Sequence, residues 1–239
     1  MKSLESEVAG VRLVPFFQRY LLLAIPEAYA GELLTKPEVS RQTEDFFTTL
    51  SVEEQFDVLD WQIHLQHVIQ DQLGAKVSIN VHNRVVETED RRRRFLEIVS
   101  RASAPCTFEF TETYPMPPVA PSNHLLRDIR SLGHQSALDD FGTGLNGMSL
   151  LTDYDFDIIK IDRSLVFDLP SRAEKRKTLR LVLEMLDVLG KAHVVEGVET
   201  EEVFDILRDL GFLNFQGFYF DAPTPLAELV AVPEKGVVS

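Results

Sequence analysis

The chain has 239 residues, of which 44% are hydrophobic and 26% charged, enough apolar material for one barrel-sized domain or two smaller ones. Its net charge of −14 argues against a nucleic-acid polymer as partner, because phosphate backbones need many unpaired lysines and arginines. The single cysteine, Cys106, excludes an intrachain disulfide. Residues 1–10 lack a signal-peptide pattern, and the apolar stretch Leu21–Ile25 is too short to span a bilayer, so we expect a cytoplasmic protein without membrane contact.

Short apolar runs alternate with longer amphipathic ones along the chain. The runs with strand character are, in order, Leu13–Phe17, Ala30–Leu34, Val77–Val81, Thr107–Phe110, Ser136–Leu138, Ile158–Ile161, His193–Val195 and Phe215–Phe220. The helical patterns are Glu53–Leu73, Lys177–Leu189, which closes at Gly190, and Thr200–Leu210, which opens on a capping threonine.

This alternation of strands and helices predicts parallel strands with covered faces. About eight such units in one chain favour an α/β fold of the TIM type, a (β/α)₈ barrel, over an open doubly wound sheet. A dinucleotide-binding sheet would need a glycine-rich turn after an early strand, and none occurs. We expect residues 1–239 to form a single domain, with 1–10 as a short N-terminal extension.

Polar residues stand at the ends of these apolar runs, where a buried charge costs several kcal/mol unless it is paired or coordinated. They are Glu32, Asn80, Glu109, Asp139, Asp140, Lys160, Glu196 and Gln216. In a parallel barrel they would converge at the C-terminal mouth. Carboxylates with one asparagine and no cysteine suit Mg²⁺ or Mn²⁺, and two ions would neutralise enough acid for a phosphate to approach. The alternative is a set of structural ion pairs with Lys160 and nearby arginines.

Such a cluster is typical of phosphodiester hydrolysis, in which two cations activate water and stabilise the leaving oxygen. Lys160 could hold the attacking water or the developing charge. The sequence contains no Gly-x-Ser-x-Gly motif, and Cys106 has no histidine near it, so nucleophilic serine or cysteine chemistry is not indicated. Phe218 or Phe220, close to Gln216, could offer a guanine base an aromatic neighbour.

Four motifs in register resemble the EAL-domain family of cyclic di-GMP phosphodiesterases. They are Asp139-Asp140-Phe141-Gly142-Thr143-Gly144, Asp157-Ile158-Ile159-Lys160-Ile161-Asp162, Glu196-Gly197-Val198-Glu199-Thr200 and Gln216-Gly217-Phe218. The resemblance covers nearly the whole chain as a stand-alone domain. It implies a modified TIM barrel, usually dimeric, that converts cyclic di-GMP to linear pGpG.

The resemblance also implies roles for individual residues. Glu32 would bind metal, and Asn80, Glu109, Asp139 and Asp140 would complete the metal shell. Lys160 would position the catalytic water, Glu196 would be a metal ligand or general base, and Gln216 would orient water or substrate. Leu33, Lys36 and Phe218 stand at substrate-binding positions. Glu199 would support the site from behind, and Glu112 would anchor the loop that contains Gly142, Thr143 and Gly144.

Departures from the family pattern leave other functions open. The signature reads Glu32-Leu33-Leu34 with leucine in place of its central alanine, and Lys36 replaces an arginine that contacts phosphate. Lysine keeps the charge but loses the bidentate fork, which should weaken substrate binding more than chemistry. One alternative is a non-catalytic EAL module that binds cyclic di-GMP or a protein partner. Another is a different two-metal phosphohydrolase on the same scaffold.

Overall fold

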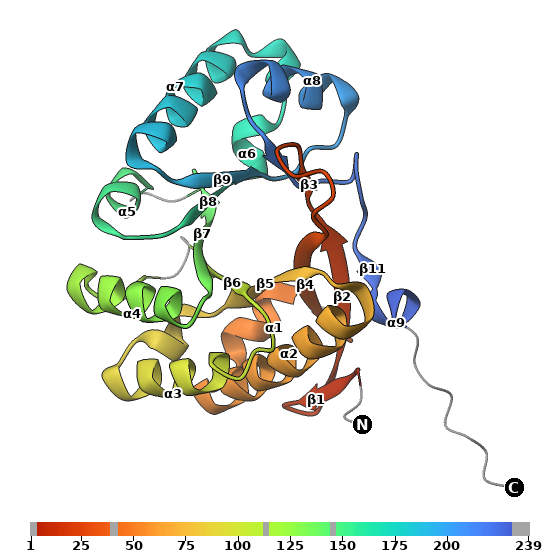
Figure 1. Ribbon diagram of the computed structural model, residues 1–239, viewed down its shortest axis with the longest axis vertical. Coiled ribbons are helices and arrows are strands. Elements are labelled where there is room, and N and C mark those ends of the chain that lie inside the picture. Colours follow the sequence, from red (N-terminus) through yellow and green to blue (C-terminus); the bar gives the residue numbers. More distant parts are fainter. Residues whose placement is uncertain (1–3, 39–42, 112–114, 144–146, 231–239) are drawn as a thin grey trace, which may run out of the picture.

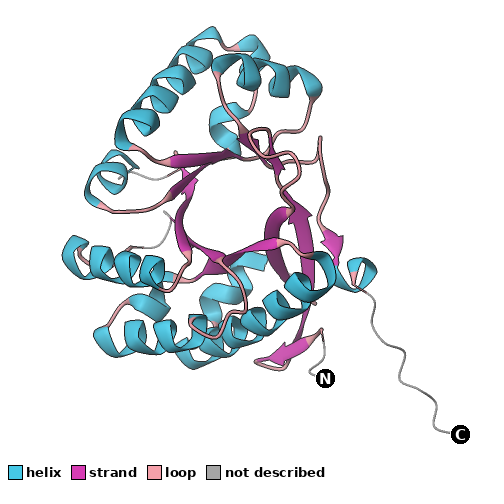
Figure 2. Ribbon diagram, viewed as in Figure 1, coloured by secondary structure: helices cyan, strands magenta, loops and turns pink. Residues whose placement is uncertain are grey.

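The apolar runs become strands that hydrogen-bond side by side in one sheet, and the sheet curves into a barrel with helices on its outside (Figures 1 and 2). The computed structural model describes residues 4–38, 43–111, 115–143 and 147–230. The strands are β1 (Ser6–Val8), β2 (Val11–Arg19), β3 (Leu21–Leu22), β4 (Ala30–Pro37), β5 (Lys76–Val81), β6 (Cys106–Thr111), β7 (Gln135–Phe141), β8 (Ile158–Ile161), β9 (Ala192–Val195), β10 (Asn214–Phe215) and β11 (Thr224–Pro225).

All but the last of the helices lie between strands in the chain, and helices cover the outer face of the barrel (Figure 2). They are α1 (Thr43–Thr49), α2 (Val52–Leu73), α3 (Glu89–Val99), α4 (Val119–Ser131), α5 (Gly147–Asp153), α6 (Arg163–Val166), α7 (Ala173–Leu189), α8 (Glu201–Leu210) and α9 (Leu226–Leu229), with 3₁₀ turns at Asn83–Val86 and Leu169–Ser171. In the part of the chain that the structure describes, no helix combines the length and apolarity needed to cross a bilayer.

Capping residues mark ends of the three helices that the sequence predicts, α2, α7 and α8. Ser51 and Glu54 form a reciprocal capping box at the start of α2. The Thr200 hydroxyl accepts a hydrogen bond from the Val203 amide at the start of α8. Helix α7 ends at Gly190 in a left-handed conformation, as a glycine after an apolar helical pattern predicts.

Strands β4 to β10 run parallel to their neighbours in the order β4-β5-β6-β7-β8-β9-β10, as the alternating pattern predicts. The first long strand is an exception, because β2 pairs antiparallel with β4. Parallel neighbours need a crossover of a dozen or more residues, usually with a helix, and residues 20–29, which connect β2 to β4, contain the short strand β3 but no helix. The expectation that this strand is parallel is therefore wrong, and the barrel is a modified one.

The segment that follows β2 closes the barrel. After Arg19 the chain turns, and β3 pairs antiparallel with β10, with Leu21 opposite Phe215. Strand β2 thus hydrogen-bonds to β4, and β3, which comes next in the sequence, hydrogen-bonds to β10. A close approach makes this possible, since a side chain at Gly31 would lie 2.4 Å from the backbone oxygen of Gln18.

The predicted strand Phe215–Phe220 is wrong beyond its first residue. The chain turns at Gly217, whose carbonyl accepts hydrogen bonds from the amides of Phe220 and Asp221. A side chain at Gly217 would lie 2.0 Å from the carbonyl oxygen of Val198, so the turn packs directly on neighbouring backbone. The aromatic residues that suggest a strand instead pack on Phe204 of α8.

Candidate active site

Lys160 is the centre of the candidate site. It lies on β8 and is 2% exposed, and its ammonium is surrounded by carboxylates from four other strands or strand ends. The distances from Lys160 Nζ to carboxylate oxygens are 2.7 Å to Glu109, 2.7 Å to Glu196, 3.0 Å to Asp139 and 3.3 Å to Glu32. A buried ammonium needs a negative charge close to it, and the four acids supply more negative charge than one ammonium requires.

The alternation of side chains along each strand explains most of this convergence. Residues two apart share a face, so Ile158 and Lys160 face the barrel interior while Ile159 and Ile161 are fully buried on the other face. In the same way Glu32, Leu34 and Lys36 share one face of β4. Glu109, Asp139 and Glu196 lie toward or just after the carboxyl ends of β6, β7 and β9, which meet at one mouth of the barrel. Glu32 is the third residue of the longer strand β4 and reaches the same lysine from there.

An irregularity in β7 explains how both Asp139 and Asp140 reach the site, because consecutive residues of a regular strand point to opposite faces. The pairing of β7 with β8 shifts register between Leu138 and Phe141, and Asp140 adopts a positive φ of 58°. Such a bulge turns an adjacent side chain toward the site. Asp140 then accepts a hydrogen bond of 3.2 Å from the Thr111 hydroxyl.

Amide groups hold Glu32 in place. Asn80 Nδ2 donates to its Oε1 at 2.5 Å, and Gln216 Nε2 donates to its Oε2 at 2.8 Å. Gln216 also donates to Gln18 Oε1 at 3.0 Å, so the first strand supports the amide from behind. The Gln216 oxygen is buried, and among the described residues it has no hydrogen-bond partner. It is thus a buried acceptor whose hydrogen-bonding capacity the described protein groups leave unused.

The crowding of acids around one lysine changes their protonation. Burial raises the pKa of Glu109 to about 8, although Lys160 opposes the shift. Burial and the neighbouring Asp139 raise the pKa of Asp140 to about 6. Burial disfavours the ionised form of Glu32 as well, but Lys160 and the two amides outweigh it and hold its pKa below the usual range. For Lys160 the carboxylates outweigh burial, so its pKa lies well above the usual value and it stays charged.

The donor set fits a divalent cation. Five carboxylates, Glu32, Glu109, Asp139, Asp140 and Glu196, face one lysine, so the fully ionised cluster carries an excess of negative charge that one ammonium cannot balance. Oxygen atoms of Asp139, Asp140 and Glu196 lie within 4.8 Å of one another, close enough to share an ion. All the donors are oxygens, which Mg²⁺, Mn²⁺ and Ca²⁺ prefer.

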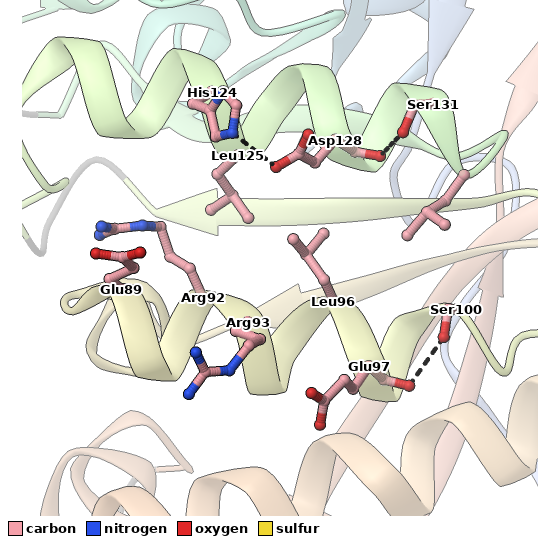
Figure 3. A pocket seen from close by; sticks show the side chains of 11 residues that line it. Glu89, Arg92, Arg93, Leu96, Glu97, Ser100, His124, Leu125, Asp128 and Ser131 are labelled. Atoms are coloured by element: carbon pink, nitrogen blue, oxygen red, sulfur yellow. Dashed lines mark hydrogen bonds and ion pairs between the residues drawn. The ribbon is translucent and has the colours of Figure 1, made fainter.

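A hollow of about 490 Å³ opens beside the carboxylates and extends under α1 and α2. Its lining includes Glu32, Leu33, Asn80, Glu109 and Asp140. A second hollow, of about 470 Å³, lies between α3 and α4 on the outside of the barrel (Figure 3). Its charged residues come from two helix surfaces and none belongs to the cluster around Lys160. Of these two hollows, the one at the mouth combines space with the acidic site.

Four other residues singled out from the sequence differ from one another in their exposure and contacts. Lys36 is exposed, with its ammonium 4.2 Å from the centre of the Phe16 ring. Leu33 is fully buried, and Phe218 is 68% exposed. Glu199 is more than half exposed and lies 3.8 Å from Arg163. The functional roles expected for these four residues stay predictions.

The loop after β7 is only partly described. Gly142 has a φ of 109°, and a side chain there would meet Leu165 at 2.5 Å, so glycine is required by both conformation and space. The Thr143 hydroxyl donates to the Asp140 carbonyl at 2.9 Å and closes the turn. Glu112 and Gly144, to which the sequence assigns loop roles, lie outside the described residues.

Thr111, which donates to Asp140, and two residues at the end of the first strand are absent from the set that the sequence predicts. Tyr20 donates a hydrogen bond of 3.0 Å to Glu109, and Gln18 supports Gln216. Gln18 and Tyr20 follow the predicted strand Leu13–Phe17, whose predicted end comes too early. The signal that identifies the other site residues is a polar side chain at the end of an apolar run. With the strand extended to its true end at Arg19, this signal would include Gln18 within the strand and Tyr20 directly after it.

Comparison with known proteins gives the family to which the chain is similar. The chain matches the EAL domain over residues 21–223. It is 33% identical over 140 residues to the cyclic di-GMP phosphodiesterase NbdA of Pseudomonas aeruginosa, covering 59% of this chain and 18% of that protein. It is 35% identical over 144 residues to the probable cyclic di-GMP phosphodiesterase PdeG of Escherichia coli, covering 60% and 28%. The chain thus spans less than a third of either relative.

Solved structures of EAL proteins have a fold similar to that of this chain. A stand-alone EAL protein of Vibrio cholerae with cyclic di-GMP bound has a TM-score of 0.76 at 25% identity, covering 89% of this chain and 92% of that one. The Klebsiella pneumoniae protein BlrP1 in a manganese and cyclic di-GMP complex also has a TM-score of 0.76 at 25% identity, covering 92% and 58%.

Proposed function

The chain belongs to the EAL domain family, and from this membership and the buried site we propose that it is a metal-dependent phosphodiesterase that hydrolyses cyclic di-GMP to linear pGpG. The observation that carries the proposal is the convergence of four carboxylates on Lys160 at the barrel mouth. The relatives named as cyclic di-GMP phosphodiesterases support the choice of substrate.

Divalent cations are part of the proposal, and Mg²⁺ or Mn²⁺, two ions for each site, suit the donors best. Asp139, Asp140 and Glu196 form one group of possible ligands, and Glu32, Asn80 and Glu109 supply the remaining oxygens. When bound, the ions supply Lewis acidity that activates water and stabilises charge on the phosphate.

The chain's own residues then perform three tasks. Lys160 stays protonated, so it acts as a hydrogen-bond donor that positions the catalytic water or offsets developing negative charge rather than as a base. Glu196, whose pKa burial raises well above its usual range despite Lys160, can accept a proton as a general base or bind metal. The free oxygen of Gln216 can accept a hydrogen bond from water or substrate.

The substrate would enter through the hollow at the mouth, which is large enough for part of a dinucleotide. We assign Lys36 to a phosphate, since it shares the strand face of Glu32, and Leu33 and Phe218 to the nucleoside portion. Lysine at position 36 offers a point charge, so we expect weaker binding than a bidentate arginine would give.

The proposal includes the arrangement of the protein as a whole. We expect residues 1–239 to act as one domain that works as a homodimer in the cytoplasm, without nucleic-acid polymers or membranes as partners. Exposed apolar side chains that follow β7 and β8, Met148 and Phe167, support self-association. Sedimentation of the purified chain tests this part, and a monomer at all concentrations would contradict it.

The test of the function is turnover by variants of the central residues. Lys160→Ala and Glu196→Gln should lose conversion of cyclic di-GMP to pGpG while keeping the circular dichroism spectrum of the fold. Lys175→Ala is a matched control, because Lys175 caps α6 through the carbonyls of Ser164 and Phe167 and does not touch the cluster. Wild-type rates in both site variants would refute the proposed mechanism. Tight binding of cyclic di-GMP without any conversion by the wild type would favour a non-catalytic module.

A further inference from the structure

Tyr20 lies where the first strand changes partners. Its amide donates to the Ala30 carbonyl at 2.9 Å, the last bond toward β4, and the next residue already pairs with β10. Gln18 and Tyr20 are two apart and therefore share the face that looks into the barrel. Phe17 and Arg19, on the other face, pack against the ring of Tyr29.

From this position the phenol reaches across the barrel interior to β6. Its hydroxyl donates to Glu109 Oε1 at 3.0 Å, while Lys160 Nζ lies 2.7 Å from the other oxygen, Oε2. Glu109 is 2% exposed, so solvent does not compete for either oxygen. The small Ser78 of β5, which is also buried, adjoins the tyrosine hydroxyl. The carboxylate is thus held at both ends by donors of different kinds.

We propose that Tyr20 is a positioning residue of the cation site, whose hydroxyl fixes the orientation of Glu109 so that Oε2 faces the centre of the cluster. Hydrogen bonds from outer residues to metal-binding carboxylates orient the ligand and are worth 10- to 100-fold in metal affinity. The Tyr20 hydroxyl is the donor that restrains Oε1, so the loss of one oxygen atom from Tyr20 should let the carboxylate rotate. This inference rests on the proposed cation binding.

The test is calorimetric titration of the purified chain with MnCl₂, with Tyr20→Phe as the variant. We expect Tyr20→Phe to weaken Mn²⁺ binding by at least about 10-fold. Tyr154→Phe is the matched control, since it also removes one phenol-to-acceptor hydrogen bond, of 3.1 Å to the Pro117 carbonyl, and it should bind Mn²⁺ as the wild type does.

A double-mutant cycle separates positioning from a general loss of packing. In a Glu109→Gln background, Tyr20→Phe should have no further effect on Mn²⁺ affinity, because the carboxylate that the tyrosine orients is gone. With excess Mn²⁺, Tyr20→Phe should recover most of the wild-type turnover of cyclic di-GMP. Equal Mn²⁺ affinity in the wild type and Tyr20→Phe would overturn the role of Tyr20 and leave the proposed function intact. Absence of Mn²⁺ binding by the wild type would overturn both.

Discussion

The mouth of the barrel and the arginine-rich surface of α3 both concentrate charge, but they balance it in opposite ways. At α3 arginines pair with acids close to them in the sequence, for example Arg91 with Glu87 and Arg93 with Asp90, whose side chains lie 2.8 Å apart. The partners are three or four residues apart in the sequence, and in each pair at least one side chain is more than half exposed, so water and salt screen them. Four consecutive arginines there form an ordinary solvated surface.

At the mouth, several acids share one lysine in a space from which water is mostly excluded. Glu109 and Lys160 are each 2% exposed, and the pKa of Glu109 rises to about 8 because burial opposes its ionisation. Such an arrangement is poor for stability unless something else neutralises the acids. The comparison teaches that the ratio of acids to bases within a buried cluster, rather than the number of charges, distinguishes a functional site from a surface.

Lys160→Met should produce the largest effect. The substitution keeps the approximate length of the side chain but removes the cation that the acids share, and breaking a buried ion pair costs about 3–5 kcal/mol of unfolding free energy. Urea unfolding in the presence of a chelator measures the loss. Mn²⁺ should restore part of it, since a cation would replace the missing charge. An unchanged urea midpoint would show that Lys160 does not balance the cluster.

The pH dependence of that loss provides a second check. The pKa of Glu109 is 4.5 in its usual state and about 8 in the fold, so between these values the unfolded chain ionises Glu109 and the fold does not. The loss of unfolding free energy that comes from the raised pKa of Glu109 is therefore absent below pH 4.5, grows as pH rises and levels off above 8. The loss of stability caused by Lys160→Met should likewise increase with pH and be smallest in acid. Urea midpoints of the variant and the wild type across this pH range measure it, and a loss that is largest in acid would contradict the assignment.

Gly142→Ala should have an intermediate effect by disturbing the turn that directs Asp140 into the site. The added methyl would meet Leu165 at 2.5 Å in a backbone with φ of 109°, and we expect a loss of about 1–3 kcal/mol together with weaker Mn²⁺ binding. Gly190→Ala is the control, because Gly190 also has a positive φ, of 64°, but has open space around it. If both variants lost the same stability and both kept full Mn²⁺ affinity, the turn at Gly142 would have no special part in the site.

Arg93→Ala should have the smallest effect. Its partner Asp90 is 85% exposed, and removal of such a surface pair changes stability by less than about 0.5 kcal/mol. Thermal unfolding at low and high salt measures the change, and turnover of cyclic di-GMP should stay at the wild-type rate. A loss comparable to that of Lys160→Met would contradict the distinction between the two regions.

Much of the fold could be predicted because its signals are local. Apolar runs, a glycine such as Gly190 after a helix and a capping residue such as Thr200 each act within a few residues of chain. The antiparallel pairing of β2 could not be predicted in this way, because pairing direction depends on how the connection to β4 folds. The aromatic run that ends at Phe220 has the composition of a strand, although its side chains pack on a helix.

The site is predictable in part for the same reason. Charged residues within apolar runs, such as Lys160, are a local signal that identifies most of its members. The bulge that brings both Asp139 and Asp140 to the mouth is a property of paired strands, and no local pattern shows it. Tyr20 reaches Glu109 from 89 residues away, a contact that only the closed barrel creates.

The most direct test of the central claim is incubation of the purified chain with cyclic di-GMP in Mg²⁺ or Mn²⁺, with the products separated by chromatography. The account predicts conversion to pGpG that stops when a chelator is added and resumes when the metal is restored. Absence of conversion with either metal, or conversion that continues at the same rate in the chelator, would contradict it.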